Sequence, residues 1–178
     1  MIRCYAVGVL VFGFSVLTAC GGAASNGAFG PRVPATGVRP LSIMLYSFGG
    51  NPDGEWPQAG LLAGKKGEYY GTTVFGGSAG DGAVYAITAA GKEKVVYSFQ
   101  GLPDGSVPES TLIMDNEGSL YGTTERGGTG GLNCGEAGCG TVFKLTPGKH
   151  GWTERVLYAF QSSPDDGAYP MAGLLMTK

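Results

Sequence analysis

The chain has 178 residues, 34 of them glycine, and a formal net charge of −2 at pH 7. Only 15% of the residues are charged, so the chain lacks the basic stripe with which a nucleic-acid-binding protein neutralises phosphates. Its aromatic content of 11% is too high for a disordered chain. Glycine instead exceeds its usual ~7% well over twofold, which favours an all-β protein with many tight turns.

The N-terminal segment MIRCYAVGVLVFGFSVLTAC has the features of a secretory signal. Arg3 precedes an apolar run over residues 5–17, which is shorter than the roughly 20 residues of a membrane-spanning helix. The tetrapeptide LTAC, which ends at Cys20, resembles a bacterial lipobox. That resemblance implies a lipoprotein signal peptide at 1–19, cleaved before Cys20, and lipid on Cys20. The alternative is a plain signal peptide with an incidental cysteine.

The anchor sets the expected location. Several acyl chains on Cys20 would hold the extracellular protein to the bacterial cell envelope, at the outer membrane or the cell surface, whereas one chain binds only marginally. The segment 20–40 is therefore predicted to be the lipidated cysteine and a flexible tether rich in glycine, alanine and proline. The folded domain is expected over residues 41–178.

The expected domain consists of repeats. Three similar copies, LYSFGGNPDGEWPQAGLL, VYSFQGLPDGSVPESTLI and LYAFQSSPDDGAYPMAGLL, lie at 45–62, 96–113 and 157–175. Because self-similarity at a fixed spacing is the signature of repeat architectures, we expect repeats over about 46–96, 97–157 and, incomplete, 158–178. The second copy is longer by the insertion GLNCGEAGCG.

Each complete repeat shows the pattern of four short strands. The predicted strands are 59–63, 68–75, 82–88 and 93–99 in the first repeat, and 110–115, 119–124, 140–146 and 153–160 in the second. Hairpin turns are expected at 115–118 and at Pro147-Gly148. Outside the signal no segment has a helical period, so no helix is predicted. Four strands per repeat of about 50 residues predict a β-propeller-like fold with antiparallel blades.

A Tyr-Gly-Thr-Thr motif recurs in LYGTTERGG…GCGTVFKLTPG at 120–148 and in YYGTTVFGGSAGDGAVYAITAAG at 69–91. On these motifs, and over roughly 45–178, the chain resembles the bacterial exported repeat family called GloVer, a choice-of-anchor tandem repeat family also described as HAF-family extracellular repeats. The resemblance implies a varied membrane or surface anchor and no activity that transfers to a residue. We predict that the motif is architectural, with its tyrosine between blades and its small residues in the crowded inner sheet.

Two complete repeats are fewer than the roughly 4–8 blades of a closed propeller. The third copy ends just after its first strand, and RPLSIMLYSF before the first copy is a last strand without its blade. The sequence thus predicts two full blades plus partial ones. Three explanations stay open: a truncated reading frame, which the break within a repeat favours; a ring of several copies, because exposed strand edges favour self-association; or an open stack.

Cys134 and Cys139 lie in the insertion, and an even pair of cysteines in an exported protein predicts a disulfide. Metal binding is the alternative, but it needs about four ligands, and His150 is the only histidine of the chain. No metal and no other cofactor is therefore expected.

Aromatic side chains in turns are the candidate binding residues. Trp56 and Tyr169 occupy equivalent repeat positions, and Trp152 lies near the last predicted strand. Such rings stack on sugars or on partner proteins when exposed, or else pack between blades. The recurring Pro-Asp-Gly segments are expected to build turns. Acidic residues near one face show no distinguished catalytic pair; they are Glu55, Asp104, Glu109, Asp165 and Asp166.

These patterns predict an exported, lipid-anchored β-repeat protein with a role in surface display, in binding a glycan or protein ligand, or in cell-envelope structure. A non-enzymatic role is favoured, and no nucleic-acid partner is expected. The alternatives are a carbohydrate-active enzyme on a propeller scaffold, either a glycan hydrolase or a lyase, and a truncated fragment without independent function.

Overall fold

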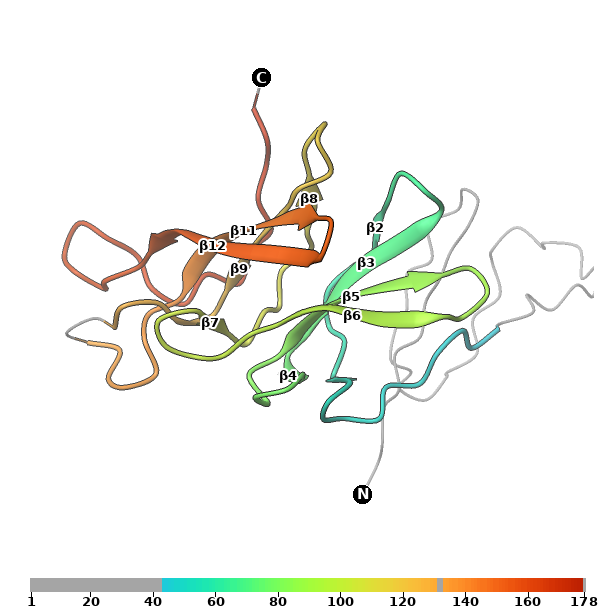
Figure 1. The fold of residues 1–178 in the computed structure, drawn as a ribbon. Coiled ribbons are helices and arrows are strands. Elements are labelled where there is room, and N and C mark those ends of the chain that lie inside the picture. The colour runs from blue at the N-terminus through green and yellow to red at the C-terminus, as the bar shows by residue number, and fades with distance from the viewer. Residues whose placement is uncertain (1–42, 131–132, 178) are drawn as a thin grey trace, which may run out of the picture. The chain divides into compact units, whose positions relative to one another are not determined.

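The computed structural model describes residues 43–130 and 133–177 (Figure 1). The chain divides into two units, Met1–Met44 and Leu45–Lys178, and the repeats lie in the second. The expected signal peptide, the lipid site at Cys20 and the tether to residue 40 all lie outside the described residues.

Two four-stranded antiparallel sheets form the second unit (Figure 1). The repeat-1 sheet has the order β2 (Leu62–Ala63), β3 (Glu68–Thr73), β5 (Ala83–Thr88) and β6 (Glu93–Ser98). The repeat-2 sheet has the order β8 (Ile113–Met114), β9 (Leu120–Thr124), β11 (Thr141–Gly148) and β12 (Gly151–Ala159). The described residues contain no helix, and hence none that could cross a membrane. The prediction of an all-β, antiparallel fold is confirmed.

Two short ladders join each Pro-Asp-Gly turn to the segment after the Tyr-Gly-Thr-Thr motif. In repeat 1, β1 (Gly54–Glu55) pairs with β4 (Phe75–Gly76). In repeat 2, β7 (Gly105–Ser106) pairs with β10 (Arg126–Gly127). The sequence pattern did not predict these ladders, because two-residue strands are too short to show alternation.

The predicted turn at Pro147-Gly148 is wrong. Both residues belong to β11, where Pro147 pairs with Trp152 and Gly148 with Gly151, so the turn consists of Lys149 and His150. A proline is tolerated here because β9 pairs with β11 only as far as Leu145, so the missing N–H interrupts no ladder on that side.

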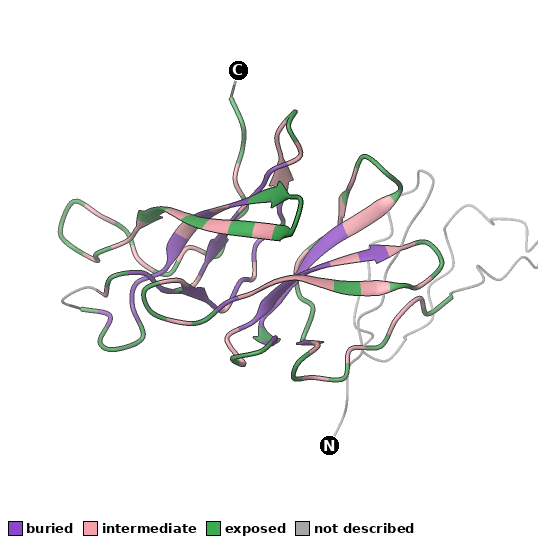
Figure 2. Ribbon diagram, viewed as in Figure 1, coloured by how far each residue is buried: buried purple, intermediate pink, exposed green. Residues whose placement is uncertain are grey.

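The hydrophobic core lies between the two sheets. Phe99, which directly follows β6 of the repeat-1 sheet, is fully buried and packs edge-on against Phe143 of β11, with ring centroids 5.0 Å apart. Buried residues follow β3, β5 and β9, whereas the hairpin ends are exposed (Figure 2). The other members of the buried cluster are Tyr70, Val84, Leu112, Leu120 and Leu145. Each sheet is therefore stabilised by its neighbour.

The glycine of the Tyr-Gly-Thr-Thr motif leaves room for an aromatic ring. A Cβ atom on Gly71 would lie 2.5 Å from the Tyr85 hydroxyl oxygen, and one on Gly122 would lie 2.8 Å from Cζ of Phe143. Because real Cβ atoms do not approach other heavy atoms so closely, only glycine fits beneath these rings.

The first threonine of the motif connects one repeat to the next. The Thr72 hydroxyl donates to the Ser110 carbonyl at 3.4 Å, and the Thr123 hydroxyl donates to the Ala172 carbonyl at 3.1 Å. The same bond thus forms at both junctions between repeats, including the junction with the incomplete third copy. The motif builds the fold, as predicted.

The aspartates of the Pro-Asp-Gly segments hold the turns. The Tyr46 hydroxyl donates to Asp53 at 2.8 Å, and the Tyr97 hydroxyl donates to Asp104 at 2.9 Å. Each carboxylate also accepts the backbone N–H of the residue four positions before it. Gly49 donates to Asp53, and Gln100 donates to Asp104. These carboxylates are therefore structural.

Candidate functional site

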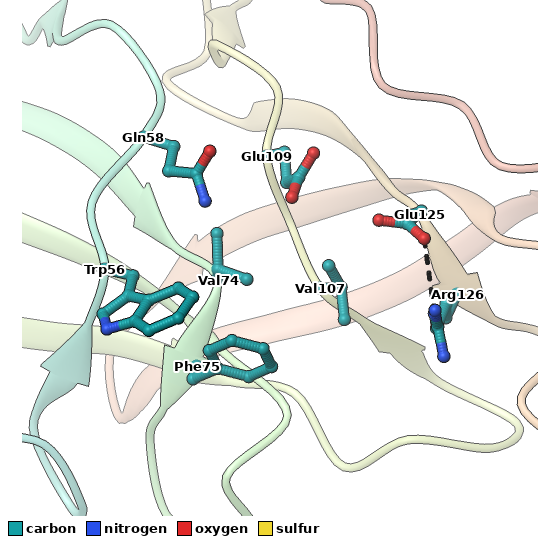
Figure 3. Close-up of a pocket in the computed structure, with 8 residues that line it drawn as sticks. All are labelled: Trp56, Gln58, Val74, Phe75, Val107, Glu109, Glu125 and Arg126. Carbon is teal, nitrogen blue, oxygen red and sulfur yellow. Dashed lines mark hydrogen bonds and ion pairs between the residues drawn. The ribbon is translucent and has the colours of Figure 1, made fainter.

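A surface cleft of about 270 Å³ lies where repeat 1 meets repeat 2 (Figure 3). Repeat 1 supplies its aromatic residues, and repeat 2 supplies all of its charged residues. The lining residues are Trp56, Gln58, Val74 and Phe75 from repeat 1, and Val107, Glu109, Glu125 and Arg126 from repeat 2.

Trp56 dominates the aromatic side of the cleft. Its side chain is 59% exposed, and its ring stands edge-on to Phe75 with centroids 5.3 Å apart. The Trp56 backbone is fixed, because its carbonyl accepts the Val74 N–H at 3.2 Å. The indole is thus exposed yet held by a rigid backbone.

The backbone at Trp56 has a left-handed φ of 59°. This conformation is uncommon for a bulky residue, and a strained position of this kind is a hint of function. Here, however, the equivalent positions Val107 and Tyr169 have φ values of 58° and 55°. The conformation is therefore a property of the repeat, and what distinguishes Trp56 is its exposed ring.

The polar side of the cleft has both charges and an amide. Arg126 donates to Glu125 through Nε at 3.3 Å. Burial, together with the nearby charge of Glu125, raises the pKa of Glu109 above its ordinary value. Together with Gln58, these side chains give the cleft both hydrogen-bond donors and acceptors (Figure 3).

Trp152 lies in a second cleft of about 220 Å³, which also involves Lys65 and Lys66 of the β2–β3 hairpin. Its ring packs edge-on against Tyr70 with centroids 5.8 Å apart and borders the buried core. Of the two interpretations of its ring, packing between sheets therefore describes Trp152 better than stacking on a ligand.

Tyr169 is 42% exposed and lines neither cleft. Its backbone N–H donates to the Cys139 carbonyl at 2.8 Å, as the Val107 N–H donates to the Asp81 carbonyl at 3.0 Å. The structure thus keeps the three candidate aromatic residues apart: Trp56 and Trp152 line different clefts, and of these two only Trp56 has a largely exposed ring.

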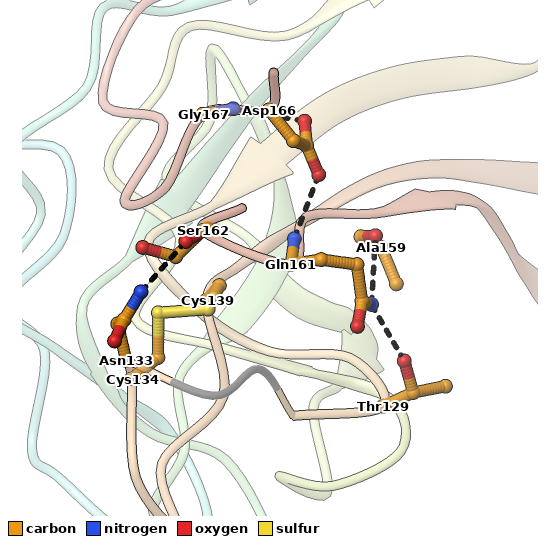
Figure 4. Close-up of a disulfide and its surroundings, with 9 residues drawn as sticks. All are labelled: Thr129, Asn133, Cys134, Cys139, Ala159, Gln161, Ser162, Asp166 and Gly167. Carbon is orange, nitrogen blue, oxygen red and sulfur yellow. Dashed lines mark hydrogen bonds between the residues drawn. A yellow bond between two sulfur atoms is a disulfide. The ribbon is translucent and has the colours of Figure 1, made fainter. Parts of the chain in front are cut away.

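Cys134 and Cys139 form the expected disulfide, with Cα atoms 5.2 Å apart (Figure 4). Asn133 donates from Nδ2 to the Ser162 carbonyl at 2.9 Å, so the insertion is tied to the start of the third repeat. No three metal-binding side chains gather within residues 43–130 and 133–177.

The five acidic residues singled out in the sequence have different surroundings. Glu109 lines the Trp56 cleft. Asp104 and Asp166 hold turns, the latter by accepting the Gln161 N–H at 2.8 Å. Glu55 and Asp165 are exposed. They therefore do not converge on one catalytic centre.

Sequence reasoning missed Phe75, Gln58, Glu125 and Arg126. A usable signal was present, because these positions differ between repeats while the motif beside them is constant: Phe75 corresponds to Arg126. Positions that are the same in both repeats build the fold. Positions beside them that differ between the repeats therefore indicate a surface that is specific to one repeat.

A family model described as Gloeobacter/Verrucomicrobia repeat matches residues 14–178, which confirms the GloVer-type resemblance. No curated protein matches the chain. With nearly the whole sequence matched and the motif residues building both sheets, the chain belongs to the Gloeobacter/Verrucomicrobia repeat family.

Proposed function

We propose that the chain is an exported, lipid-anchored binding protein that displays a glycan-binding cleft at Trp56 on neighbouring blades of an incomplete propeller. One observation carries the glycan assignment: an exposed tryptophan on a hydrogen-bonded backbone lines a cleft that also holds an amide, two carboxylates and a guanidinium.

The chemistry of sugars matches this arrangement. Sugar rings have apolar C–H faces that stack on aromatic rings, and their hydroxyls exchange hydrogen bonds with carboxylates, amides and guanidinium groups. A stacked sugar would also remove part of the exposed Trp56 indole from water, which is favourable. At about 270 Å³ the cleft is smaller than typical drug-sized pockets of about 300–1,000 Å³. It therefore suits one sugar unit of a longer glycan.

The location is proposed from the sequence. The lipobox-like LTAC and the tether to residue 40 support an anchor on Cys20 at the cell envelope. Labelled fatty acid should be incorporated by the wild-type chain and not by Cys20→Ser, and this variant should leave the membrane fraction. Retention of label by Cys20→Ser would contradict the proposal.

Binding is tested with the full chain on a panel of immobilised polysaccharides. Trp56→Ala should weaken binding at least about fivefold, if the loss of one stacked ring costs roughly the 1–3 kcal/mol found for a base on an aromatic ring. Tyr169→Ala is the matched control, since it removes an exposed ring at the equivalent repeat position with the same backbone conformation. Equal losses in the two variants, or no binding to any glycan, would refute the assignment.

Fluorescence gives a second measurement, because the chain has only two tryptophans. In a Trp152→Phe background all indole emission comes from Trp56. Ligand stacked on the exposed ring should shift this emission to shorter wavelength, whereas a ligand bound elsewhere should leave it unchanged.

Hydrolysis of a glycan is the second candidate, and the raised pKa of Glu109 beside Glu125 favours it. A glycosidase needs one protonated carboxyl group near a second carboxylate. Release of reducing ends by the wild-type chain and its loss in Glu109→Gln would establish this activity. Binding without release leaves the cleft as a binding site.

A further inference from the structure

The charges that line the Trp56 cleft do not balance. Two carboxylates, those of Glu109 and Glu125, line it together with one guanidinium, that of Arg126 (Figure 3). Arg126 donates to Glu125 through Nε at 3.3 Å, so the cationic side chain of the cleft is already paired. The cleft therefore has a surplus negative charge, which belongs to Glu109.

The Glu109 carboxylate has no counter-ion in the part of the chain that the structure describes. Neither of the two ion pairs formed there includes it. Burial, and then the nearby charge of Glu125, raises the pKa of Glu109. Both causes act against the ionised form of Glu109, and a positive charge placed beside it would favour that form. A cationic group between Glu109 and Glu125 would supply this charge.

The aromatic side of the cleft suits a cation as well. Among aromatic side chains, indole attracts cations most strongly, because its ring face carries partial negative charge. The Trp56 ring is largely exposed although Phe75 contacts it edge-on, so a ligand can still reach it. The ring and the carboxylates therefore favour a ligand of the same charge.

The same charges disfavour an acidic sugar. Its carboxylate or sulfate group would lie close to Glu109 and Glu125, and like charges at short distance repel. Arg126 already offsets Glu125, and its half-exposed side chain is screened by solvent. A neutral sugar avoids the repulsion, but it leaves the Glu109 carboxylate without a counter-ion.

An amino sugar combines the two features that the cleft favours. Its ring has an apolar C–H face, which stacks on an aromatic side chain, and its ammonium group is bonded directly to that ring. An ammonium group donates several hydrogen bonds, and such bonds to carboxylates are about twice as strong as bonds between neutral groups. One sugar unit can therefore contact Trp56 and a carboxylate at the same time.

We propose that the sugar bound at Trp56 is an amino sugar whose ammonium group lies between Glu109 and Glu125. This inference rests on the glycan-binding role proposed above and specifies the class of sugar. A metal ion fits the carboxylates less well. A hard cation takes about six oxygen ligands, and no three metal-binding side chains gather among the described residues.

The test compares three tetramers with the same linkage, which differ only at C2 of each sugar. Glucosamine carries an ammonium group there, glucose a hydroxyl group, and N-acetylglucosamine a neutral amide. Each is titrated into the purified full chain in mild detergent, and Trp56 emission is followed in the Trp152→Phe background. The pH is set where the carboxylates and the ammonium group are both charged. The glucosamine tetramer should bind at least about tenfold more tightly than either neutral tetramer, which corresponds to about 1.4 kcal/mol.

Glu109→Gln should abolish this preference, because glutamine keeps the size of the side chain and removes its charge. Glu136→Gln is the matched control, since it removes the same charge in the exposed part of the insertion and should keep the preference. Added salt should reduce the preference in the wild type, because it screens the attraction between the ammonium group and the carboxylates.

Three results would overturn the amino-sugar assignment. The first is a neutral tetramer that binds as tightly as the glucosamine tetramer, or more tightly; the glycan-binding role would then stand without this assignment. The second is a preference that Glu109→Gln and Glu136→Gln affect equally, which would indicate general attraction to a chain of net charge −2. The third is a lysine tetrapeptide that binds as tightly as the glucosamine tetramer. If no tetramer binds, both the assignment and the glycan-binding role are wrong.

Discussion

The replacement of Glu154 by glutamine should stabilise the protein at neutral pH and leave it unchanged in acid. Glu154 lies in β12, and its Oε1 atom is buried without a hydrogen-bond partner. Burial, and then the nearby charge of Asp104, raises the pKa of Glu154 from its ordinary value of 4.5 to about 7. Burial raises the pKa of Asp104 as well.

The sign follows from which state holds the proton. Below about pH 4.5 the carboxyl group is protonated in both states, so it imposes no cost. Between about pH 4.5 and 7 the unfolded chain releases the proton while the folded chain keeps it, so stability falls as pH rises. Above pH 7 the folded state carries the full cost of a poorly solvated charge.

The magnitude follows from the shift of the pKa. Each pKa unit corresponds to about 1.4 kcal/mol of unfolding free energy. Because Glu154 is only half-buried, solvent screens part of this, and we expect a gain of about 1–2 kcal/mol for Glu154→Gln at pH 8. Near pH 4 the variant and the wild type should unfold at the same urea concentration.

The assay is urea unfolding followed by circular dichroism at several values between about pH 4 and pH 8. Glu136→Gln, in the exposed part of the insertion, is the control and should change nothing. A stability difference between Glu154→Gln and the wild type that is the same at every pH would refute the reasoning, because it would not arise from titration.

Three further predictions concern the packing of the fold. Phe99→Ala should lower the unfolding free energy by about 3–5 kcal/mol, as measured by urea unfolding, and its effect should not add to that of Phe143→Ala because the rings are in contact. Gly122→Ala should cost about 1–3 kcal/mol, since its Cβ would meet the Phe143 ring; a melting temperature equal to that of the wild type would show that the ring can move aside. Reduction of the Cys134–Cys139 disulfide should cost about 2 kcal/mol, the entropy of so short a loop, and thermal melting with and without reductant measures it.

The repeats and their strands were predictable because their signals are local. Alternation, glycine-containing turns and the spacing of 51 residues between motif copies located β3, β5, β6, β9 and β12 within a few residues. The prediction placed Phe75 in the strand 68–75, whereas the structure places it in β4. The structure instead pairs it with the Pro-Asp-Gly turn, because Gly77 donates its N–H to the Asp53 carbonyl at 2.5 Å.

The predicted first strand of each repeat shows where local signals fail. Residues 59–63 form a ladder only at Leu62–Ala63, and 110–115 only at Ile113–Met114. Among the remaining residues, Gly60 donates its backbone N–H to the Thr111 hydroxyl at 3.2 Å, and the Ser110 carbonyl accepts the Thr72 hydroxyl at 3.4 Å; both bonds join one repeat to the other. A local sequence pattern cannot reveal which hydrogen-bond partner such a residue takes, since the partner is about fifty residues away in the chain.

The candidate site was likewise only partly predictable from the sequence. Trp56 was predictable from its place in a turn, but its neighbours Glu109 and Glu125 were not, because the cleft exists only where two repeats meet. The sequence likewise marked Trp152 and Tyr169 as equal candidates. The structure shows that Trp152 differs from Trp56 and Tyr169, because its ring packs against Tyr70 whereas the other two rings are exposed.

The sequence by itself determined the repeating architecture. Each copy of the Tyr-Gly-Thr-Thr motif carries the glycine that fits beneath an aromatic ring and the threonine that bonds to a backbone carbonyl of the next repeat. Only the tertiary structure decided which aromatic residues are exposed. Phe99 and Phe160 have the same motif around them, yet Phe99 is fully buried and Phe160 is not. The difference is the presence of a following sheet, and burial depends on that neighbour rather than on the residue.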